Sequence, residues 1–199
     1  KKELVKARLA KRLRKLHFSD FEQYLEYLAG DRTGAELTAM LDAISTNLTS
    51  FFREAEHFRC LTEQVIAPKL ASSGPKRLRL WSAGCSSGEE PYSIAIVLRE
   101  EIRDIDLWDA KVLATDLSTQ VLAKASAGLY GQERVRQISP MLRGRYFTAR
   151  QVDGRCVYEV KESVRRLVHF ARLNLMGTWP MRGPFDVIFC RNVMIYFDK

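Results

Sequence analysis

The spacing of the apolar residues divides the chain into two parts. Over residues 1–46 they recur every three or four positions, which is the period of an amphipathic α-helix. The first such stretch keeps its apolar residues on one side, at Val5, Leu9, Leu13 and Leu16. A second begins near Ser19 and Glu22, which have the spacing of a capping box, and a third covers residues 34–46. We therefore predict a small all-helical domain over residues 1–46.

From residue 47 onward, short apolar runs alternate with amphipathic helical stretches. The runs that we predict as strands are residues 77–83, 110–116, 156–160, 167–175 and 185–192. Strands that alternate with helices along a chain form a parallel sheet with helices packed on its faces. Ligands of such sheets bind at the carboxyl ends of the strands. We predict that residues 47–199 form an α/β domain with a ligand site at that edge.

Small and acidic residues follow the first two predicted strands. Gly84 and Gly88 lie in the turn "SAGCSSGEE", where small residues let a ligand approach the backbone, although their spacing is not that of the dinucleotide-binding fingerprint. Asp116 ends the second strand, where a carboxylate can accept hydrogen bonds from both hydroxyls of a ribose. The arrangement indicates a cofactor that contains a nucleoside, with Gly84 and Asp116 among its contacts.

Two adjacent carboxylates begin the helix that follows this turn. Glu89 and Glu90 would repel a pyrophosphate, even though a helix N-terminus by itself favours an anion. An adenosine joined to a cationic amino acid suits the position better, because a carboxylate can pair with its ammonium group. S-adenosylmethionine has these parts and NAD does not. We predict that Glu90 contacts this cofactor, and for Glu89 a role in capping the helix is an equal alternative.

The composition narrows the class of protein. Hydrophobic residues make up 46% of the chain and charged residues 28%, as in globular proteins. No apolar run approaches the roughly 20 residues that span a bilayer, and none follows the basic start as in a signal peptide. We therefore expect a cytoplasmic protein that does not insert into the membrane. The four cysteines and three histidines are scattered, so neither a disulfide framework nor a metal site is predicted.

Most of the net charge of +8 lies at the start of the chain, where residues 1–16 hold eight basic residues against one acidic. Four of the basic residues share the side of the first predicted helix that faces away from its apolar residues: Arg8, Lys11, Arg12 and Lys15. None has an acid three or four positions away to pair with, so we predict that they bind an acidic partner. A solvated face and a nucleic-acid surface are the alternatives. The aromatic residues of the second helix are not interleaved with these cations, which argues against nucleic acid.

Four longer motifs stand out: "NLTSFFRE" at 47–54, "WSAGCSSGEEPYSIAI" at 81–96, "TDLS" at 115–118 and "GPFDVIFCRNVMIYFDK" at 183–199. Together with the basic helical start, they resemble the chemotaxis receptor methyltransferases of the CheR family along the whole chain. The resemblance implies a Rossmann-like class I methyltransferase domain after a small all-α domain. It also implies methylation of glutamate side chains on the cytoplasmic helices of chemoreceptors in chemotaxis adaptation. S-adenosylmethionine would be the methyl donor and S-adenosylhomocysteine the product.

The resemblance also implies roles for individual residues. The cofactor contacts would be Asn47, Thr49 and Arg53 between the domains, Glu90 and Asp116 at the amino group and ribose, Asn174 and Leu175 at the adenine, and Cys190, Arg191 and Asn192 in the last turn. Arg53 and Tyr196 would lie near the transferred methyl group and act in catalysis. The cations of the first helix would bind the acidic helices of the receptor bundle. Members of the family continue with further strands and a small β-subdomain, so we expect the second domain to be incomplete at its C-terminal end.

Methyl transfer to a carboxylate does not need acid–base catalysis by the enzyme. A glutamate side chain has an ordinary pKa of about 4.3 and is already ionised at neutral pH, so no general base is needed. Arg53 would orient the incoming carboxylate and Tyr196 would donate a hydrogen bond to it. Two other functions stay open. A nucleic-acid methyltransferase is disfavoured because the turn "RNVMIY" replaces the [N/D]-P-P-[Y/F] motif common in those enzymes, and the third reading is a cofactor-binding adaptor without catalysis.

Overall fold

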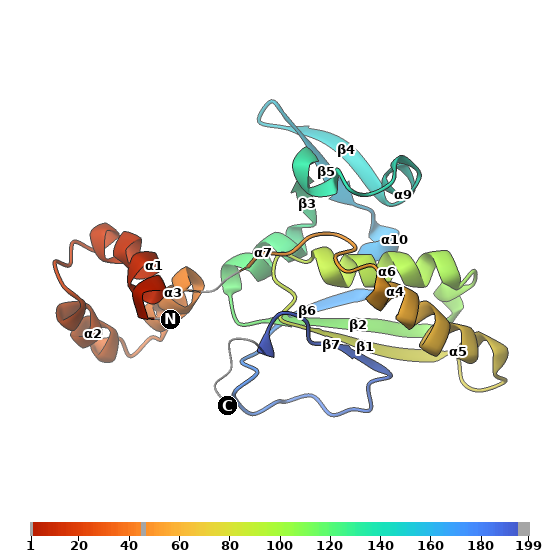
Figure 1. Ribbon diagram of the computed structural model, residues 1–199, viewed down its shortest axis with the longest axis horizontal. Helices are drawn as coiled ribbons and strands as arrows, with labels where there is room; N and C mark the ends of the chain where they lie inside the picture. The colour runs from red at the N-terminus through yellow and green to blue at the C-terminus, as the bar shows by residue number, and fades with distance from the viewer. Residues whose placement is uncertain (1, 45–46, 195–199) are drawn as a thin grey trace.

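The computed structural model describes residues 2–44 and 47–194. The domain boundary predicted at residue 46 and the catalytic candidate Tyr196 lie outside these residues. Figure 1 shows a helical body at the N-terminal end and a larger body that contains the sheets.

Residues 2–44 form three helices, as the apolar spacing predicts: α1 (Lys2–Lys15), α2 (Phe21–Gly30) and α3 (Ala35–Ile44). Leu9, Leu13 and Tyr24 form their buried core. Val5 is 40% exposed, so the apolar side of α1 is not buried over its whole length. These helices bury few large side chains, and a small domain of this kind has little hydrophobic stabilisation to spare.

Two aspartates set the starts of α2 and α3. Asp20 is the N-cap of α2, because its carboxylate accepts a hydrogen bond from the backbone N–H three residues on (2.9 Å). The predicted capping box of Ser19 and Glu22 is therefore wrong by one position. Asp31 accepts a hydrogen bond from the backbone N–H of Glu36 (2.7 Å) and so orders the turn into α3.

The larger domain is built on a four-stranded parallel sheet with the order β6-β2-β1-β7, which confirms the predicted fold class. Its strands are β1 (Arg77–Ala83), β2 (Asp109–Asp116), β6 (Val168–Arg172) and β7 (Val187–Phe189). Leu78, Leu80 and Val112 are completely buried and belong to one core cluster with Ile94 and Ile96 of a helix that covers them. The strands are apolar because they lie in the middle of the domain.

One face of this sheet carries helices. They are α4 (Glu56–Leu61), the π-helix η1 (Thr62–Ile66), α5 (Ala67–Ala71), α6 (Glu89–Glu101), the 3₁₀-helix η2 (Ile105–Leu107), α7 (Thr119–Ala127) and α10 (Glu162–Arg165). Figure 1 shows α4, α6 and α10 above the sheet and an extended segment below it. That segment packs Trp179 and Phe185 against Trp81. We predicted helices on both faces, and in the part of the chain that the structure describes the second face has this segment instead.

A second, smaller sheet projects from the domain above α6 (Figure 1). It is antiparallel, with the order β3-β5-β4, and its elements are β3 (Leu129–Gly131), α8 (Gln132–Val135), α9 (Pro140–Tyr146), β4 (Phe147–Val152) and β5 (Arg155–Val160). Asp153 and Gly154 join β4 to β5 and both have positive φ (49° and 71°), as a tight hairpin requires. The run 156–160 thus belongs to this sheet and not to the parallel one. A small antiparallel sheet, which the sequence did not predict, therefore lies within residues 129–160.

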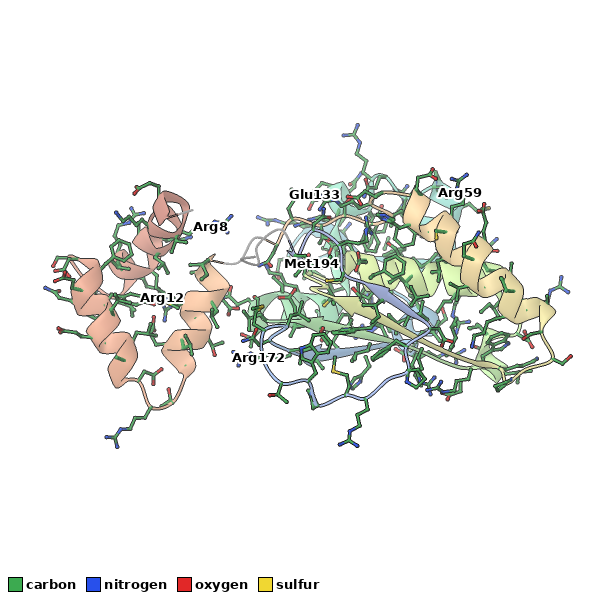
Figure 2. The ribbon with its side chains drawn as sticks, turned by 60° about the horizontal axis from the view of Figure 1, so that its bottom comes forward. Arg8, Arg12, Arg59, Glu133, Arg172 and Met194 are labelled. Atoms are coloured by element: carbon green, nitrogen blue, oxygen red, sulfur yellow. The ribbon has the colours of Figure 1, made fainter. Side chains whose placement is uncertain are left out.

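The helical domain touches the α/β domain through α3. The hydroxyl of Thr119 at the start of α7 donates to the carboxylate of Asp42 (3.1 Å), and Arg172 at the end of β6 donates to the hydroxyl of Thr38 (3.1 Å). Figure 2 shows Arg172 on the side of the α/β domain that faces α3. The carboxyl ends of the strands therefore lie on the side nearest the helical domain.

Candidate functional site

Four strand ends meet at one edge of the parallel sheet, as predicted. From β1 the chain proceeds to β2 and then β6 on one side, whereas β7 pairs with the other side of β1. The strands that follow β1 in the chain are thus added first on one side of it and then, with β7, on the other. Parallel sheets bind ligands at such a switch point in the strand order. The turns after these four strands form the candidate site.

The turn after β1 needs its glycines for backbone geometry. Gly84 has φ +78° and Gly88 has φ +95°, a region that other residues rarely adopt. A Cβ on Gly84 would lie 2.4 Å from a methyl group of Val193, and one on Gly88 would lie 2.8 Å from the hydroxyl of Tyr130. The space beside Gly84 is thus filled by the turn after β7. A cofactor contact from its backbone remains a prediction.

Asp116 holds this turn in place from the end of β2. Its two carboxylate oxygens accept hydrogen bonds from the backbone N–H groups of Ser86 (2.8 Å) and Ser118 (2.9 Å). Burial raises the pKa of Asp116, although both hydrogen bonds act in the opposite direction. Each carboxylate oxygen has a second lone pair, so the group can still accept hydrogen bonds from a ribose.

The two adjacent glutamates have different environments. Glu89 is completely buried and accepts hydrogen bonds from the hydroxyl of Ser87 (2.7 Å) and from Arg134 (3.1 Å). This supports the alternative that Glu89 organises the start of α6. Glu90 accepts from the hydroxyl of Ser82 (2.7 Å) and pairs with Arg191 (3.1 Å). Its side chain is 13% exposed, and burial raises its pKa in spite of the arginine.

Arg191 connects the turn after β7 to the segment between the domains. One guanidinium nitrogen pairs with Glu90 and the other with Glu54 (3.2 Å), and the second also donates to the backbone carbonyl of Arg53. The guanidinium also lies over the ring of Phe58, 5.8 Å from its centre. Arg191 thus links the turn after β7, the start of α6 and the segment between the domains, and Glu90 already has a cation beside it.

The other predicted residues of the last turn lie beside Arg191. Cys190 is half-buried, and burial and then the charge of Glu90 raise the pKa of its thiol. Asn192 is exposed and has φ +55°, a conformation that asparagine tolerates better than most residues. Both residues therefore lie at the edge where the four strands end.

The connecting segment, residues 47–54, is fastened to the α/β domain along its length. The hydroxyl of Ser86 donates to the carbonyl of Asn47 (3.1 Å), and the N–H of Phe52 donates to the hydroxyl of Ser93 (2.9 Å). Arg53 donates to the carbonyl of Leu48 (3.1 Å), and its side chain is 36% exposed. The structure thus brings Asn47 to the turn after β1, and it leaves the Arg53 side chain partly exposed; cofactor contacts of Asn47, Thr49 and Arg53 remain predictions.

Asn174 and Leu175 lie next to Asp116, because the N–H of Leu173 donates to the Asp116 carbonyl (3.0 Å). Asn174 is exposed, and its side-chain oxygen accepts a hydrogen bond from the N–H of Met176 (3.0 Å). Leu175 is half-buried in the cluster below the sheet. Both residues follow β6 at the edge where the strands end, and their contact with an adenine remains a prediction.

The basic side of α1 differs from the prediction. Arg12 donates to both carboxylate oxygens of Glu36, which is 5% exposed and also accepts a hydrogen bond from the hydroxyl of Tyr24 (2.8 Å). Arg8 donates to the carbonyl of Ile44. Figure 2 shows Arg12 between the helices of this domain. The prediction that these four cations have no acid to pair with is therefore wrong, because Arg12 pairs with an acid of α3 rather than of α1.

Two of the four cations that we predicted to bind an acidic partner are exposed, as expected. Lys11 and Lys15 are exposed on α1. A substrate-binding role for Arg8, Lys11, Arg12 and Lys15 stays a prediction, and it now depends mainly on the two lysines.

The geometry fits S-adenosylmethionine better than a phosphate-rich cofactor. Two carboxylates, Glu90 and Asp116, lie at the strand ends and are both disfavoured by burial in their charged forms. A ligand with a positive charge relieves that cost, whereas a pyrophosphate would increase it. Within residues 2–44 and 47–194, no three His, Cys, Asp or Glu residues gather as metal ligands would. In the same residues, no helix combines the length and the apolar character needed to cross a membrane.

Several residues of the site had no signal in the local sequence. Arg134 and Gln137 come from α8 and the turn after it, and they donate to the carbonyls of Thr49 (3.1 Å) and Phe51 (2.6 Å). Glu54 pairs with Arg191 from more than a hundred positions away. These contacts depend on the tertiary fold, which the periodicity of one segment does not report.

The comparisons with known proteins agree with this geometry. A family model described as "CheR methyltransferase, SAM binding domain" matches residues 47–199, and one described as "CheR methyltransferase, all-alpha domain" matches residues 1–45. A probable chemotaxis protein methyltransferase of Rhizobium etli is 43% identical over all of this chain and 75% of its own length. Chemotaxis protein methyltransferases of Klebsiella aerogenes and Escherichia coli are 44% and 41% identical over all of this chain, which covers 67% and 68% of their lengths.

Proposed function

The chain belongs to the CheR methyltransferase family, and we propose that it methylates glutamate side chains on the cytoplasmic helices of chemoreceptors, with S-adenosylmethionine as methyl donor and S-adenosylhomocysteine as product. The relatives named as chemotaxis protein methyltransferases support a methyltransferase that acts in chemotaxis. The glutamate acceptor, the methyl ester and the cytoplasmic location are the finer parts of the proposal.

One observation carries the assignment of the site. Glu90 at the start of α6 and Asp116 at the end of β2 place two half-buried carboxylates at the edge where the parallel strands end, and burial raises the pKa of both. Burial of a carboxylate in its charged form costs free energy. Carboxylates whose pKa is raised in this way are typical of binding sites. Their negative charge suits an ammonium group at Glu90 and ribose hydroxyls at Asp116.

The chemistry needs orientation more than acid–base catalysis. When bound, S-adenosylmethionine supplies a methyl group on a positively charged sulfur, which is a good leaving group. The acceptor carboxylate is ionised at neutral pH, since its ordinary pKa is about 4.3. Arg53 has a partly exposed guanidinium at the edge of the site, and we propose that it holds this carboxylate in line with the methyl group. Tyr196 is proposed to donate a hydrogen bond to the same carboxylate.

The exposed lysines of α1 support an acidic partner. Lys11 and Lys15 lie on the helical domain, which meets the α/β domain through α3 on the side where the strands end. A receptor helix that carries glutamates would be attracted to these charges as it approaches the site. We therefore propose that the acidic helices of the chemoreceptor bundle bind across both domains.

A labelling experiment tests the proposed function. The chain is incubated with S-adenosylmethionine labelled in its methyl group, together with a chemoreceptor cytoplasmic fragment or with RNA. We expect label on the receptor fragment, and we expect mild base to release it as methanol because a methyl ester is base-labile. A receptor fragment with its acceptor glutamates changed to glutamine is the matched control. Label in RNA would favour a nucleic-acid methyltransferase, and cofactor binding without any transfer would favour an adaptor.

A further inference from the structure

We propose that Arg134 is a positioning residue for methyl transfer, which fixes the connecting segment to the first turn of α6 and so holds Thr49 and Arg53 in place. The inference rests on the proposed function, since it concerns the same site. Arg134 belongs to α8, outside the turns that follow the parallel strands.

Arg134 joins two parts of the site through one nitrogen. Its Nη1 donates to the backbone carbonyl of Thr49 (3.1 Å) and to the carboxylate of Glu89 (3.1 Å). Glu89 is completely buried, whereas the Arg134 side chain is 43% exposed. The carboxylate therefore anchors the arginine from inside the domain, and the arginine in turn holds the carbonyl of the connecting segment. Hydrogen bonds between charged groups are stronger than neutral ones, which makes Glu89 a firm anchor.

Neighbouring residues of the small-sheet region reinforce the same arrangement. Gln137 donates to the carbonyl of Phe51 (2.6 Å), and the hydroxyl of Tyr130 donates to the carbonyl of Ser87 (2.7 Å). The ring of Phe51 packs edge-to-face on Tyr130, with 4.9 Å between the ring centres. The region at 129–160 is thus bonded both to the connecting segment and to the turn after β1.

The backbone of the connecting segment requires such support. Phe52 and Glu54 have φ of +51° and +56°, which lie in the left-handed region that these residues rarely adopt. Conformations of this kind persist only when the surroundings hold them. Arg53 lies between these two residues, so the direction of its guanidinium depends on contacts that fix the segment. The Thr49 carbonyl is four residues before Arg53, and Arg134 is the charged group that holds it.

The principal test compares Arg134→Ala with Arg136→Ala. Arg136 is the exposed residue that directly follows α8, two positions after Arg134, and it serves as the matched control. For Arg134→Ala we expect kcat to fall on the order of tenfold to hundredfold, because small misplacements of catalytic groups have effects of that size. We expect KM for the receptor fragment to stay the same. Arg134→Lys keeps a cation beside Glu89 and should recover part of the lost kcat.

Hydrogen–deuterium exchange supplies a readout that does not need turnover. In Arg134→Ala, the amides of residues 47–54 should exchange faster than in the original chain, and in Arg136→Ala they should not. Unchanged kcat together with unchanged exchange would overturn the proposal. If the original chain transfers no methyl group, the proposed function fails, and the exchange of residues 47–54 still decides whether Arg134 fixes the segment.

A second variant separates positioning from the cost of a buried charge. Arg134→Ala leaves the buried Glu89 side chain without its cation, which by itself can destabilise the domain. The double variant Glu89→Gln with Arg134→Ala has no buried charge, but the Thr49 carbonyl still lacks its donor. We expect this variant to fold and to keep both the low kcat and the fast exchange at 47–54. Recovery of the original kcat in the double variant would contradict the proposal.

Discussion

Two glutamate–arginine pairs in this protein have opposite electrostatic characters. Glu36 of the helical domain receives two hydrogen bonds from Arg12 and one from Tyr24, and the Arg12 contact lowers its pKa. Glu90 at the strand ends also pairs with an arginine, Arg191, but burial has the larger effect and raises its pKa. The first carboxylate is fully compensated by its neighbours, and the second is not.

The difference separates a structural pair from a functional one. A compensated pair stabilises the fold that contains it, whereas a carboxylate whose charge is disfavoured is typical of a site that awaits a ligand. Arg191 is shared between Glu90, Glu54 and the Arg53 carbonyl, so Glu90 receives only part of its charge. We expect the same substitution to have opposite consequences in the two places.

The largest effect is expected from this matched substitution. Glu36→Gln removes the charge that Arg12 and Tyr24 contact and should lower the free energy of unfolding of the helical domain by about 3 kcal/mol, within the range for a broken buried pair. Glu90→Gln keeps the acceptor for Ser82 and should change stability little, while it weakens cofactor binding. Thermal unfolding followed by circular dichroism, with calorimetric titration of S-adenosylhomocysteine, measures both. Equal loss of stability in the two variants would contradict the distinction.

Arg53→Ala is expected to lower kcat about hundredfold, as for the loss of a charged group that acts on the reacting atoms. Arg53 is 36% exposed and contacts the Leu48 carbonyl, so the fold should persist. Initial rates of methyl-ester formation measure the effect, and Arg59→Ala at an exposed position of α4 is the control. Near-normal turnover of Arg53→Ala would remove it from the mechanism.

Cofactor affinity is expected to depend on pH through Glu90 and Asp116. Both have pKa values raised by burial, so each takes up a proton at a higher pH than an ordinary carboxyl group, near 4. The ligand needs the ionised forms. Affinity should therefore be complete at neutral pH and fall as pH decreases through the raised pKa values, by up to about tenfold per unit and per group. Titrations from neutral pH down to the ordinary carboxyl pKa near 4 measure this, and a flat profile would show that neither carboxylate titrates with binding.

The smallest effect is expected from the exposed cations of α1. Lys11→Ala and Lys15→Ala should each raise KM for the receptor fragment a few-fold at low salt, because surface charges mainly accelerate encounter. The effect should vanish at high ionic strength, where such charges are screened. Initial rates at two salt concentrations measure it. If the variants match the original chain at low salt, the acidic partner does not bind this helix.

The location of the candidate site could be predicted from the local sequence, for a physical reason. The strand ends were predictable because parallel strands place their carboxyl ends on one edge, so residues as distant as Glu90 and Arg191 had to meet there. The two acids after the first strand gave the sign of the ligand's charge. These inferences need only the period of each element and the direction of the strands.

Other features depend on contacts between elements. Arg12 was expected to be free because no acid lies within one helical turn, yet Glu36 reaches it from a different helix. Arg134 contacts Thr49 from a position 85 residues away, and nothing in either segment signals the pair. The small antiparallel sheet was not predicted, since a single apolar run does not say which sheet it joins.

The central claim, that the strand ends bind S-adenosylmethionine, is tested most directly by titration of S-adenosylhomocysteine into Asp116→Ala and Asp109→Ala. The two residues lie at opposite ends of β2, and the carboxylate of Asp109 pairs with Arg79 far from the site. We predict that Asp116→Ala weakens binding about tenfold or more, as expected for lost hydrogen bonds to a charged group, and that Asp109→Ala leaves it unchanged. Equal affinity of the original chain and Asp116→Ala would contradict the account.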